Sequence, residues 1–113
     1  ENRIQPVIFR IANPEIIVAN IVILNNHSVE FTYATLNADY VDIITSFGQD
    51  QVSLSPNGTI VFNYLLVNTL YDLTIIARDI NSHFDTLDLN FNIISNIVNN
   101  TKGILGLKRG KEL

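Results

Sequence analysis

The chain has 113 residues, of which 47% are apolar and 16% are charged, and it contains no Cys, Met or Trp. This length suits one domain, and the apolar fraction is large enough for a hydrophobic core, so wholesale disorder is excluded. The absence of Cys excludes a disulfide framework, a thiolate metal site and a cysteine nucleophile. No uncharged apolar run reaches the roughly 18 residues of a candidate transmembrane helix.

Charge is distributed unevenly along the chain. Residues 1–101 carry three basic and ten acidic side chains, whereas residues 102–113 carry four basic side chains and one acidic side chain. An acidic body repels phosphate groups, which argues against a nucleic-acid-binding surface on the fold itself. In the basic tail, Lys108 and Arg109 are candidate contacts to a partner, and a solvated tail or a linker to a further domain is the alternative.

Apolar and polar side chains alternate with a period of two along most of the chain, which indicates half-buried β-strands. A first alternating run covers residues 7–11 and is ended by Asn13-Pro14. Further apolar or alternating runs cover residues 15–24, 29–33, 41–43, 52–54, 60–62, 71–77 and 87–93. The strongest turn signal is Ser55-Pro56-Asn57-Gly58, because Asn-Gly tolerates the positive φ of a tight turn. It predicts a hairpin between the strands on either side.

Seven or eight short strands at roughly ten-residue spacing are typical of an antiparallel β-sandwich. A parallel sheet would need crossover helices, and no stretch before residue 95 has helical periodicity. We therefore predict an all-β, immunoglobulin-like Greek-key sandwich of 7–8 antiparallel strands over residues 1–95. Residues 96–113 are predicted to form a basic, partly disordered tail or linker.

Several segments carry a resemblance to a known family. They read IQPVIFRIANPEI, VEFTYATLNADYVDI, VSLSPNGTIVF, LYDLTIIARD and LDLNFNI. Across about residues 4–94 the chain resembles bacterial and archaeal immunoglobulin-like modules of the Ig, PKD or cadherin-like type, with Phe31 or Tyr33 where the family often has Trp. The resemblance implies a module of a cell-surface or envelope protein, outside the cytoplasm. Ala77-Arg78-Asp79 is also similar to the A-x-D of cadherin repeats, which bind Ca²⁺.

Two features of the predicted strands bear on structural and metal-binding roles. Tyr71 stands at the start of the penultimate strand, the position of a tyrosine corner, where its ring would be buried and its hydroxyl would bond upstream backbone.

Asp79, Asp85 and Asp88 form a loose acidic cluster. Ca²⁺ takes about six to eight oxygen ligands, and Asp85 and Asp88 face opposite sides of a strand. A solvated acidic rim is the preferred interpretation, and we predict no metal or cofactor.

The sequence supplies little that predicts catalysis. The two histidines, His27 and His83, lie in predicted turns without a second ligand pair at metal-binding spacing. Ser82, His83 and Asp85 are the residue types of a catalytic triad, but adjacency in sequence is not triad geometry. No nucleophile elbow, phosphate-binding glycine loop or zinc-binding helix motif occurs, so we predict a non-enzymatic protein. Three N-glycosylation sequons, which chance supplies in an Asn-rich chain, begin at Asn26, Asn57 and Asn99.

The leading hypothesis is a binding or spacer module that contacts a protein or a surface glycan through its end loops or an open edge strand. Exposed aromatic residues would mark such a site, and the candidates near the loops are Tyr40, Phe47 and Phe84. The alternative is a structural assembly or anchoring subunit of a surface filament or coat that oligomerises through edge strands. A carbohydrate-binding accessory domain is a third hypothesis. It needs a row of exposed rings, for which the chain has only Tyr33, Tyr40, Tyr64 and Tyr71 besides Phe.

Overall fold

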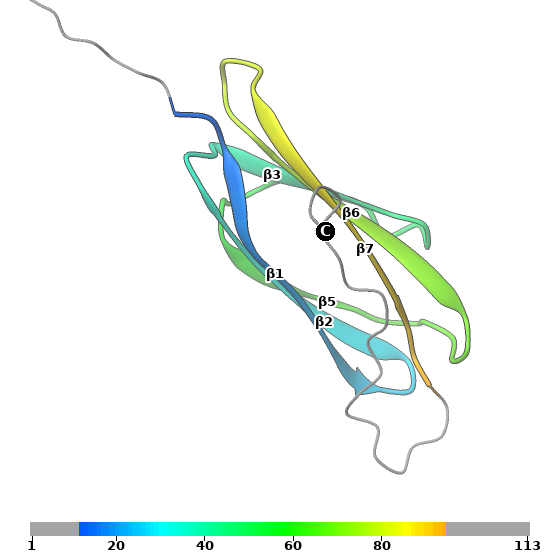
Figure 1. Cartoon of the computed structure of the whole chain (residues 1–113). Coiled ribbons are helices and arrows are strands. Elements are labelled where there is room, and N and C mark those ends of the chain that lie inside the picture. The colour runs from blue at the N-terminus through cyan, green and yellow to red at the C-terminus, as the bar shows by residue number, and fades with distance from the viewer. Residues whose placement is uncertain (1–11, 95–113) are drawn as a thin grey trace, which may run out of the picture.

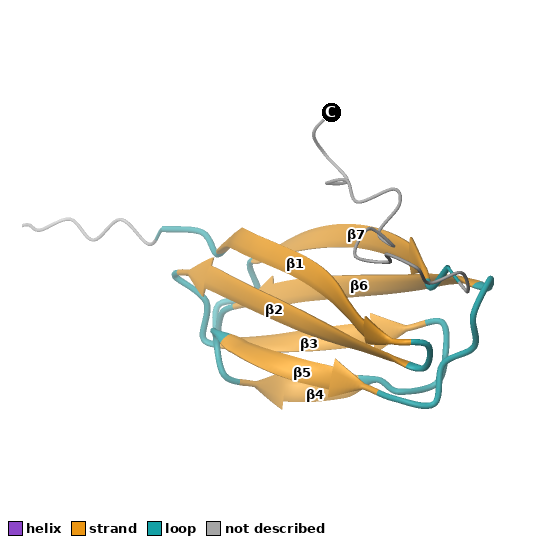
Figure 2. Cartoon of the chain, turned by 90° about the horizontal axis from the view of Figure 1, so that it is seen from below, coloured by secondary structure: helices purple, strands orange, loops and turns teal. Residues whose placement is uncertain are grey.

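The computed structural model describes residues 12–94, which form two antiparallel β-sheets packed face to face (Figure 1, Figure 2). The three-stranded sheet has the order β1 (Glu15–Asn25), β2 (Ser28–Leu36), β5 (Gly58–Phe62). The four-stranded sheet has the order β4 (Gln51–Leu54), β3 (Tyr40–Thr45), β6 (Leu70–Arg78), β7 (Phe84–Asn92). The chain crosses between the sheets after β2, β4 and β5, so the predicted immunoglobulin-like sandwich is confirmed.

The strands coincide with the alternating runs of the sequence. Every run predicted from residue 15 onward lies within a strand, except that the last run extends past β7 to Ile93, which forms an isolated bridge with Val67. The predicted strand over residues 7–11 and the predicted tail from residue 96 lie outside the described residues. Within residues 12–94 no helix is long and apolar enough to cross a membrane.

The hydrophobic core fills the space between the sheets. Along β2, for example, Val29, Phe31 and Tyr33 point inward and are buried, and the residues between them are half-buried on the outer face. The buried apolar side chains are Ile16, Ile21, Val29, Phe31, Tyr33, Val41, Ile43, Phe62, Leu65, Leu73, Ile75, Ala77, Leu87, Leu89, Phe91 and Ile93. Because full burial of one large apolar side chain contributes about 1.5–3 kcal/mol, this set is the main stabilising element of the fold.

The connection after β4 corrects one prediction. Ser55-Pro56-Asn57-Gly58 does not close a hairpin, because β4 pairs with β3 whereas β5 pairs with β2. The segment instead carries the chain from one sheet to the other, and the φ of Gly58 is not positive. Turn residues predict a change of direction, but they do not choose the partner of the next strand. Backbone pairing of β4 with β3 and of β5 with β2 makes that choice, and it brings Leu54 and Phe62 to the core from the two different sheets.

Gly58 is required by a close approach. A Cβ atom at this position would lie 2.9 Å from the Tyr33 hydroxyl and 3.2 Å from Cζ of the same ring. The Tyr33 hydroxyl donates a hydrogen bond to the carbonyl of Ser55 (3.0 Å), and the Thr35 N–H donates to Oδ1 of Asn57 (3.0 Å). The crossing segment is therefore bonded to β2, and burial raises the pKa of the Tyr33 hydroxyl.

The segment before β6 contains the predicted tyrosine corner. The N–H of Leu66 donates to the Tyr71 hydroxyl at 2.8 Å, so the hydroxyl does bond upstream backbone, as expected. The Tyr71 ring is half-buried and lies 5.6 Å from the ring of Phe91, measured between centroids. Beside it, the N–H of Asn68 donates to the carbonyl of Ile93 (2.7 Å). These contacts fix the crossover from β5 to β6.

Candidate functional site

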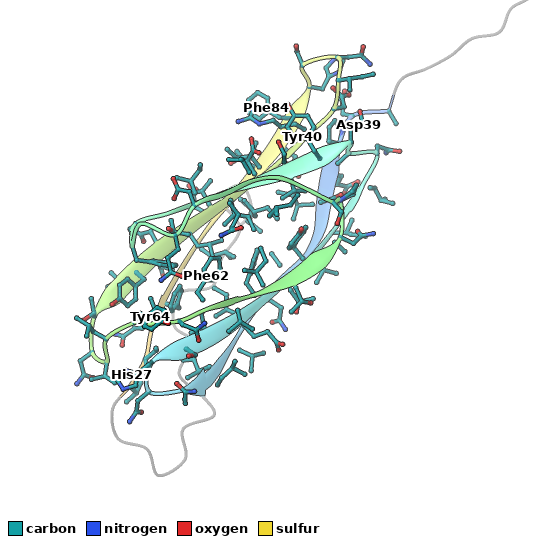
Figure 3. The ribbon with its side chains drawn as sticks, turned by 180° about the vertical axis from the view of Figure 1, so that it is seen from behind. His27, Asp39, Tyr40, Phe62, Tyr64 and Phe84 are labelled. Carbon is teal, nitrogen blue, oxygen red and sulfur yellow. The ribbon has the colours of Figure 1, made fainter. Side chains whose placement is uncertain are left out.

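Two of the aromatic residues singled out in the sequence lie together at one end of the four-stranded sheet. Tyr40 is the first residue of β3 and Phe84 is the first residue of β7, and both lie at the same end of the sandwich (Figure 3). Tyr40 pairs with Arg78 of β6, and Arg78 pairs with Phe84. Because their strand neighbours Val41 and Ala77 point into the core, the three side chains form one row on the outer face.

Arg78 occupies the centre of this row and is held in place. Its Nε donates to Oδ2 of Asp42 at 2.8 Å, and Oδ1 of Asp42 accepts a hydrogen bond from the N–H of Ser53 (2.9 Å). The Arg78 side chain is 36% exposed and that of Asp42 16% exposed. The ion pair is made through Nε, so the two terminal nitrogens of the guanidinium lie outside this contact and can donate to a ligand.

The loop between β6 and β7 completes this end of the sheet. Oδ1 of Asp79 accepts hydrogen bonds from the N–H groups of Asn81 and His83, both at 2.9 Å, and Oδ2 lies 3.2 Å from Nδ1 of His83. Burial opposes ionisation of Asp79, but the hydrogen bonds and the His83 ring outweigh it, so the pKa of Asp79 is lowered. The ionised carboxylate thus organises the loop.

The same loop displays an apolar side chain next to the row. Ile80 is 79% exposed and Phe84 is 60% exposed, whereas Tyr40 is half-buried. The N–H of Ile80 donates to Oδ2 of Asp39 (2.9 Å), which bonds this loop to the connection before β3. We define the surface formed by Tyr40, Arg78, Ile80 and Phe84 as the row surface. It combines two aromatic rings, one aliphatic side chain and one guanidinium.

Phe47, the third aromatic candidate, lies apart from Tyr40 and Phe84. Its ring packs edge-on against Phe62, Tyr71 and Phe91, with centroids 5.4, 5.1 and 5.9 Å apart. The loop turns inward because Gly48 has a φ of +75° and the backbone around it is bonded to Thr45. Phe47 is therefore partly buried against the core, at the end of the sandwich opposite the row surface.

The three clustered aspartates have separate hydrogen-bond donors. Asp85 accepts from the N–H of Ile16 (2.9 Å), which joins β7 to the edge strand β1, and Asp88 accepts from the Thr74 hydroxyl (2.7 Å). Asp85 is half-buried and Asp88 exposed, in agreement with their opposite faces. Among the residues that the structure describes, no group of three His, Asp or Glu side chains is placed to hold a metal ion.

The other residues considered in the sequence are the two histidines and the two basic residues of the tail. His27 lies in the turn between β1 and β2, at the opposite end of the sandwich from the His83 loop (Figure 3), so the two histidines do not meet. Lys108 and Arg109 lie outside the described residues. Sequence reasoning did not assign Arg78 and Ile80 to a site. The alternation of β6 could have placed Arg78 on the outer face, but its neighbours depend on strand pairing.

The two-sheet arrangement, the Greek-key connections and the tyrosine corner define the chain as an immunoglobulin-like β-sandwich module. No family model matches the chain, and no curated protein matches its sequence. Among solved structures it is similar to one described as "Structure of FN3tt mut", with a TM-score of 0.50 and 19% sequence identity over 68% of this chain and 94% of that chain. The fold is therefore of the fibronectin type III kind, and at this identity the similarity concerns the fold alone.

Proposed function

We propose that this chain is a non-enzymatic immunoglobulin-like module that binds a protein partner through the row surface. The single observation that carries the proposal is the row in which Tyr40 and Phe84 flank Arg78 across three strands. Tyr and Arg are the residue types most enriched among the side chains that dominate binding energy at protein interfaces. The exposed apolar side chains of Ile80 and Phe84 supply the area that a partner would remove from water.

Preorganisation supports this surface as a binding site. Arg78 is held by Asp42, and the loop that carries Ile80 is held by Asp79 and Asp39. A surface whose side chains and loops are already ordered loses less conformational entropy when a partner binds. The separation of the two histidines and the individual donors of the acidic residues support a role without catalysis.

The cellular setting belongs to the same proposal. The resemblance to bacterial and archaeal immunoglobulin-like modules supports a place at the cell surface or in the envelope, outside the cytoplasm. In such a setting the sandwich would space other domains while the row surface contacts a protein partner.

The test compares two exposed apolar residues of the four-stranded sheet in a capture experiment. The full chain is immobilised, and partners are captured from envelope and soluble extracts of the source organism. Phe84→Ala removes an exposed ring of the row surface, whereas Leu70→Ala changes a residue of similar exposure, 62% against 60%, at the end of β6 far from Phe84. We expect Phe84→Ala to weaken capture of a specific envelope protein by about tenfold or more, and Leu70→Ala to leave it unchanged.

Two results would contradict the placement. Equal capture by the wild type, Phe84→Ala and Tyr40→Ala would show that the row surface makes no contact. The second result is that removal of residues 102–113 abolishes capture while Tyr40→Ala and Phe84→Ala leave it unchanged. This result would place the contact in the segment that contains Lys108 and Arg109.

A structural assembly subunit is the second candidate, and the geometry of β1 favours it. This strand is 11 residues long, lies at an edge of the three-stranded sheet and exposes four large apolar side chains. They are Ile17, Val18, Val22 and Leu24, each between 41% and 47% exposed. An exposed edge strand with apolar side chains can pair with another copy or with a partner strand.

A further inference from the structure

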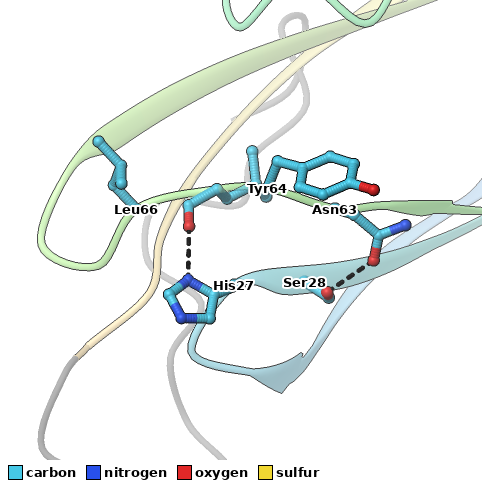
Figure 4. A pocket seen from close by; sticks show the side chains of 6 residues that line it. His27, Ser28, Asn63, Tyr64 and Leu66 are labelled. Atoms are coloured by element: carbon cyan, nitrogen blue, oxygen red, sulfur yellow. Dashed lines mark hydrogen bonds between the residues drawn. The ribbon is translucent and has the colours of Figure 1, made fainter.

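A pocket of about 600 Å³ lies at the end of the sandwich opposite the row surface, where Figure 3 shows His27 and Tyr64; Figure 4 shows it from close by. It is lined by His27 of the turn before β2, Ser28 at the start of β2, and four residues that follow β5: Asn63, Tyr64, Leu65 and Leu66. Its volume falls within the range of about 300–1,000 Å³ that is common for small-ligand sites. None of these residues belongs to the row surface, and of the six the sequence singled out only Tyr64, as one of four tyrosines of a carbohydrate-binding hypothesis, and His27.

Tyr64 is held in a strained backbone conformation with its ring in solvent. Its φ is +65°, in the left-handed region, which is unfavourable for residues with a Cβ. Tyr64 is 90% exposed. Strain at a non-glycine residue persists only where the surroundings impose it, and such residues cluster at binding sites. An exposed tyrosine buries nothing that would offset this cost within the described part of the fold.

Both neighbours of Tyr64 impose this conformation. The carbonyl of Asn63 accepts a hydrogen bond from Nε2 of Gln49, and Oδ1 of Asn63 accepts one from the Ser28 hydroxyl, both at 2.7 Å. On the other side, the N–H of Leu65 donates to the carbonyl of His27 (2.9 Å), and the Leu65 side chain is buried. The ring is therefore presented from a fixed backbone position beside the pocket.

The polar groups of the pocket can serve hydroxyl groups as both acceptor and donor. Nδ1 of His27 lies 3.0 Å from the carbonyl of Leu65, which can only accept, so Nδ1 carries a proton. In the neutral tautomer with this proton, Nε2 is an acceptor. The Ser28 bond uses the amide oxygen of Asn63, so the amide nitrogen supplies two N–H donors. Figure 4 shows His27 and Asn63 with Tyr64 and Leu66, which line the same pocket, the Tyr64 ring lying on the side of Asn63.

Charge narrows the class of ligand. The six lining residues include no Lys, Arg, Asp or Glu. Residues 12–94 as a whole carry nine acidic side chains and one basic side chain, Arg78, which lies at the other end of the fold. This field repels phosphates, sulfates and carboxylates, and the pocket offers them no cation. The ligand that fits is uncharged, with one apolar face for an aromatic ring and hydroxyls around its edge.

We propose that this pocket binds a neutral oligosaccharide, with the Tyr64 ring stacked on the C–H face of one sugar and His27 and Asn63 bonded to its hydroxyls. The ring faces of neutral sugars are apolar and their edges carry hydroxyls that both donate and accept, which matches the two kinds of group in the pocket. The site is separate from the row surface and takes a different class of ligand.

The test follows backbone amide signals of the ¹⁵N-labelled full chain during titration with chitotriose, cellotriose, α-mannobiose and lactose. We expect at least one of these probes to give saturable shifts confined to residues 26–28 and 63–67. Tyr64→Ala should weaken that binding at least tenfold, whereas Tyr64→Phe, which keeps the ring, should leave it unchanged. Tyr64→Gly should lose binding and melt no lower than the wild type, because glycine adopts the positive φ without strain.

Three controls define the outcomes that would overturn the proposal. Absence of shifts with all four probes up to about 20 mM, a concentration that detects even very weak sites, would exclude it. Shifts that survive Tyr64→Ala would show that the ring is not involved. Tighter binding of sialyllactose than of lactose would contradict the neutral class. Phe84→Ala should bind sugar normally and Tyr64→Ala should capture the protein partner normally, so each proposal can fail without the other.

Discussion

The Tyr71 hydroxyl stabilises the fold through its hydrogen bond with the Leu66 N–H, at the point where the chain passes from one sheet to the other. It accepts the N–H of Leu66, and its ring lies against Phe47 and Phe91. Removal of one partner leaves the Leu66 N–H without its bond while the ring packing is kept.

We expect Tyr71→Phe to lower the free energy of unfolding by about 0.5–1.5 kcal/mol, the usual net contribution of one hydrogen bond, because the exposed Leu66 N–H can bond to water in its place. Tyr64→Phe removes the same atom from a ring that is 90% exposed and should change stability by less than about 0.5 kcal/mol. Urea denaturation monitored by circular dichroism measures both. Equal effects of the two substitutions would contradict the role of the tyrosine corner.

The contact between Gly58 and Tyr33 is the second residue-scale constraint. In Gly58→Ala the new Cβ would meet the Tyr33 hydroxyl at 2.9 Å, and the ring is buried and bonded to Ser55, so it cannot move without loss. We expect a loss of about 1–3 kcal/mol, as for other overpacked positions. Tyr33→Phe removes the clashing oxygen, so a double-mutant cycle should show that the two substitutions together cost less than the sum of the single changes. Additive losses would show that the oxygen is not the obstacle.

At the scale of elements, the loop from β6 to β7 depends on the ionised form of Asp79. Its carboxylate accepts two backbone N–H groups and lies against the His83 ring, and its pKa is lowered from the ordinary value of 3.8. A carboxylate with a lowered folded-state pKa stabilises the native state above its unfolded pKa. This contribution is lost as the pH falls through the folded-state value.

Asp79→Asn should therefore be less stable than the wild type at pH 7 and should lose less stability than the wild type between about pH 5 and pH 2. Urea denaturation at several pH values measures the difference. Asp72→Asn, which changes an exposed aspartate of β6, should follow the wild-type curve. Parallel curves for Asp79→Asn and the wild type would refute a contribution from this carboxylate.

At the scale of the whole molecule, the described residues form an acidic body with exposed apolar edges. Nine acidic side chains and one arginine lie within residues 12–94, so two sandwiches repel each other. The exposed apolar side chains of β1 favour association of two copies, whereas the repulsion between their negative charges opposes it. Salt weakens the repulsion and leaves apolar contact in place, so ionic strength separates them.

We expect the chain to be monomeric in sedimentation at low ionic strength, as a binding module that meets its partner alone would be. Any dimer should form only as salt rises, and Val22→Asp, which adds a charge to the outer face of β1, should abolish it. A stable dimer at low salt that Val22→Asp dissociates would contradict this expectation and favour the assembly subunit. The measurement is sedimentation equilibrium over a range of concentrations.

The alternation of apolar and polar residues and the turn residues located the strands and the tyrosine corner, because these signals depend only on residues close together in the sequence. The same local pattern also supplied Tyr40 and Phe84, two of the residues of the row surface. It could not supply the site itself, because Tyr40, Arg78 and Phe84 become neighbours only when β3, β6 and β7 pair in one register.

The tertiary structure decided the features that depend on contacts between distant segments. It assigned β4 and β5 to different sheets, turned Phe47 into the core and left Tyr64 in solvent. Phe47 and Tyr64 are both loop aromatics in the sequence, and nothing local distinguishes them. Phe47 packs among the rings of Phe62, Tyr71 and Phe91, whereas hydrogen bonds of Asn63 and Leu65 fix the backbone that holds Tyr64 outside the core.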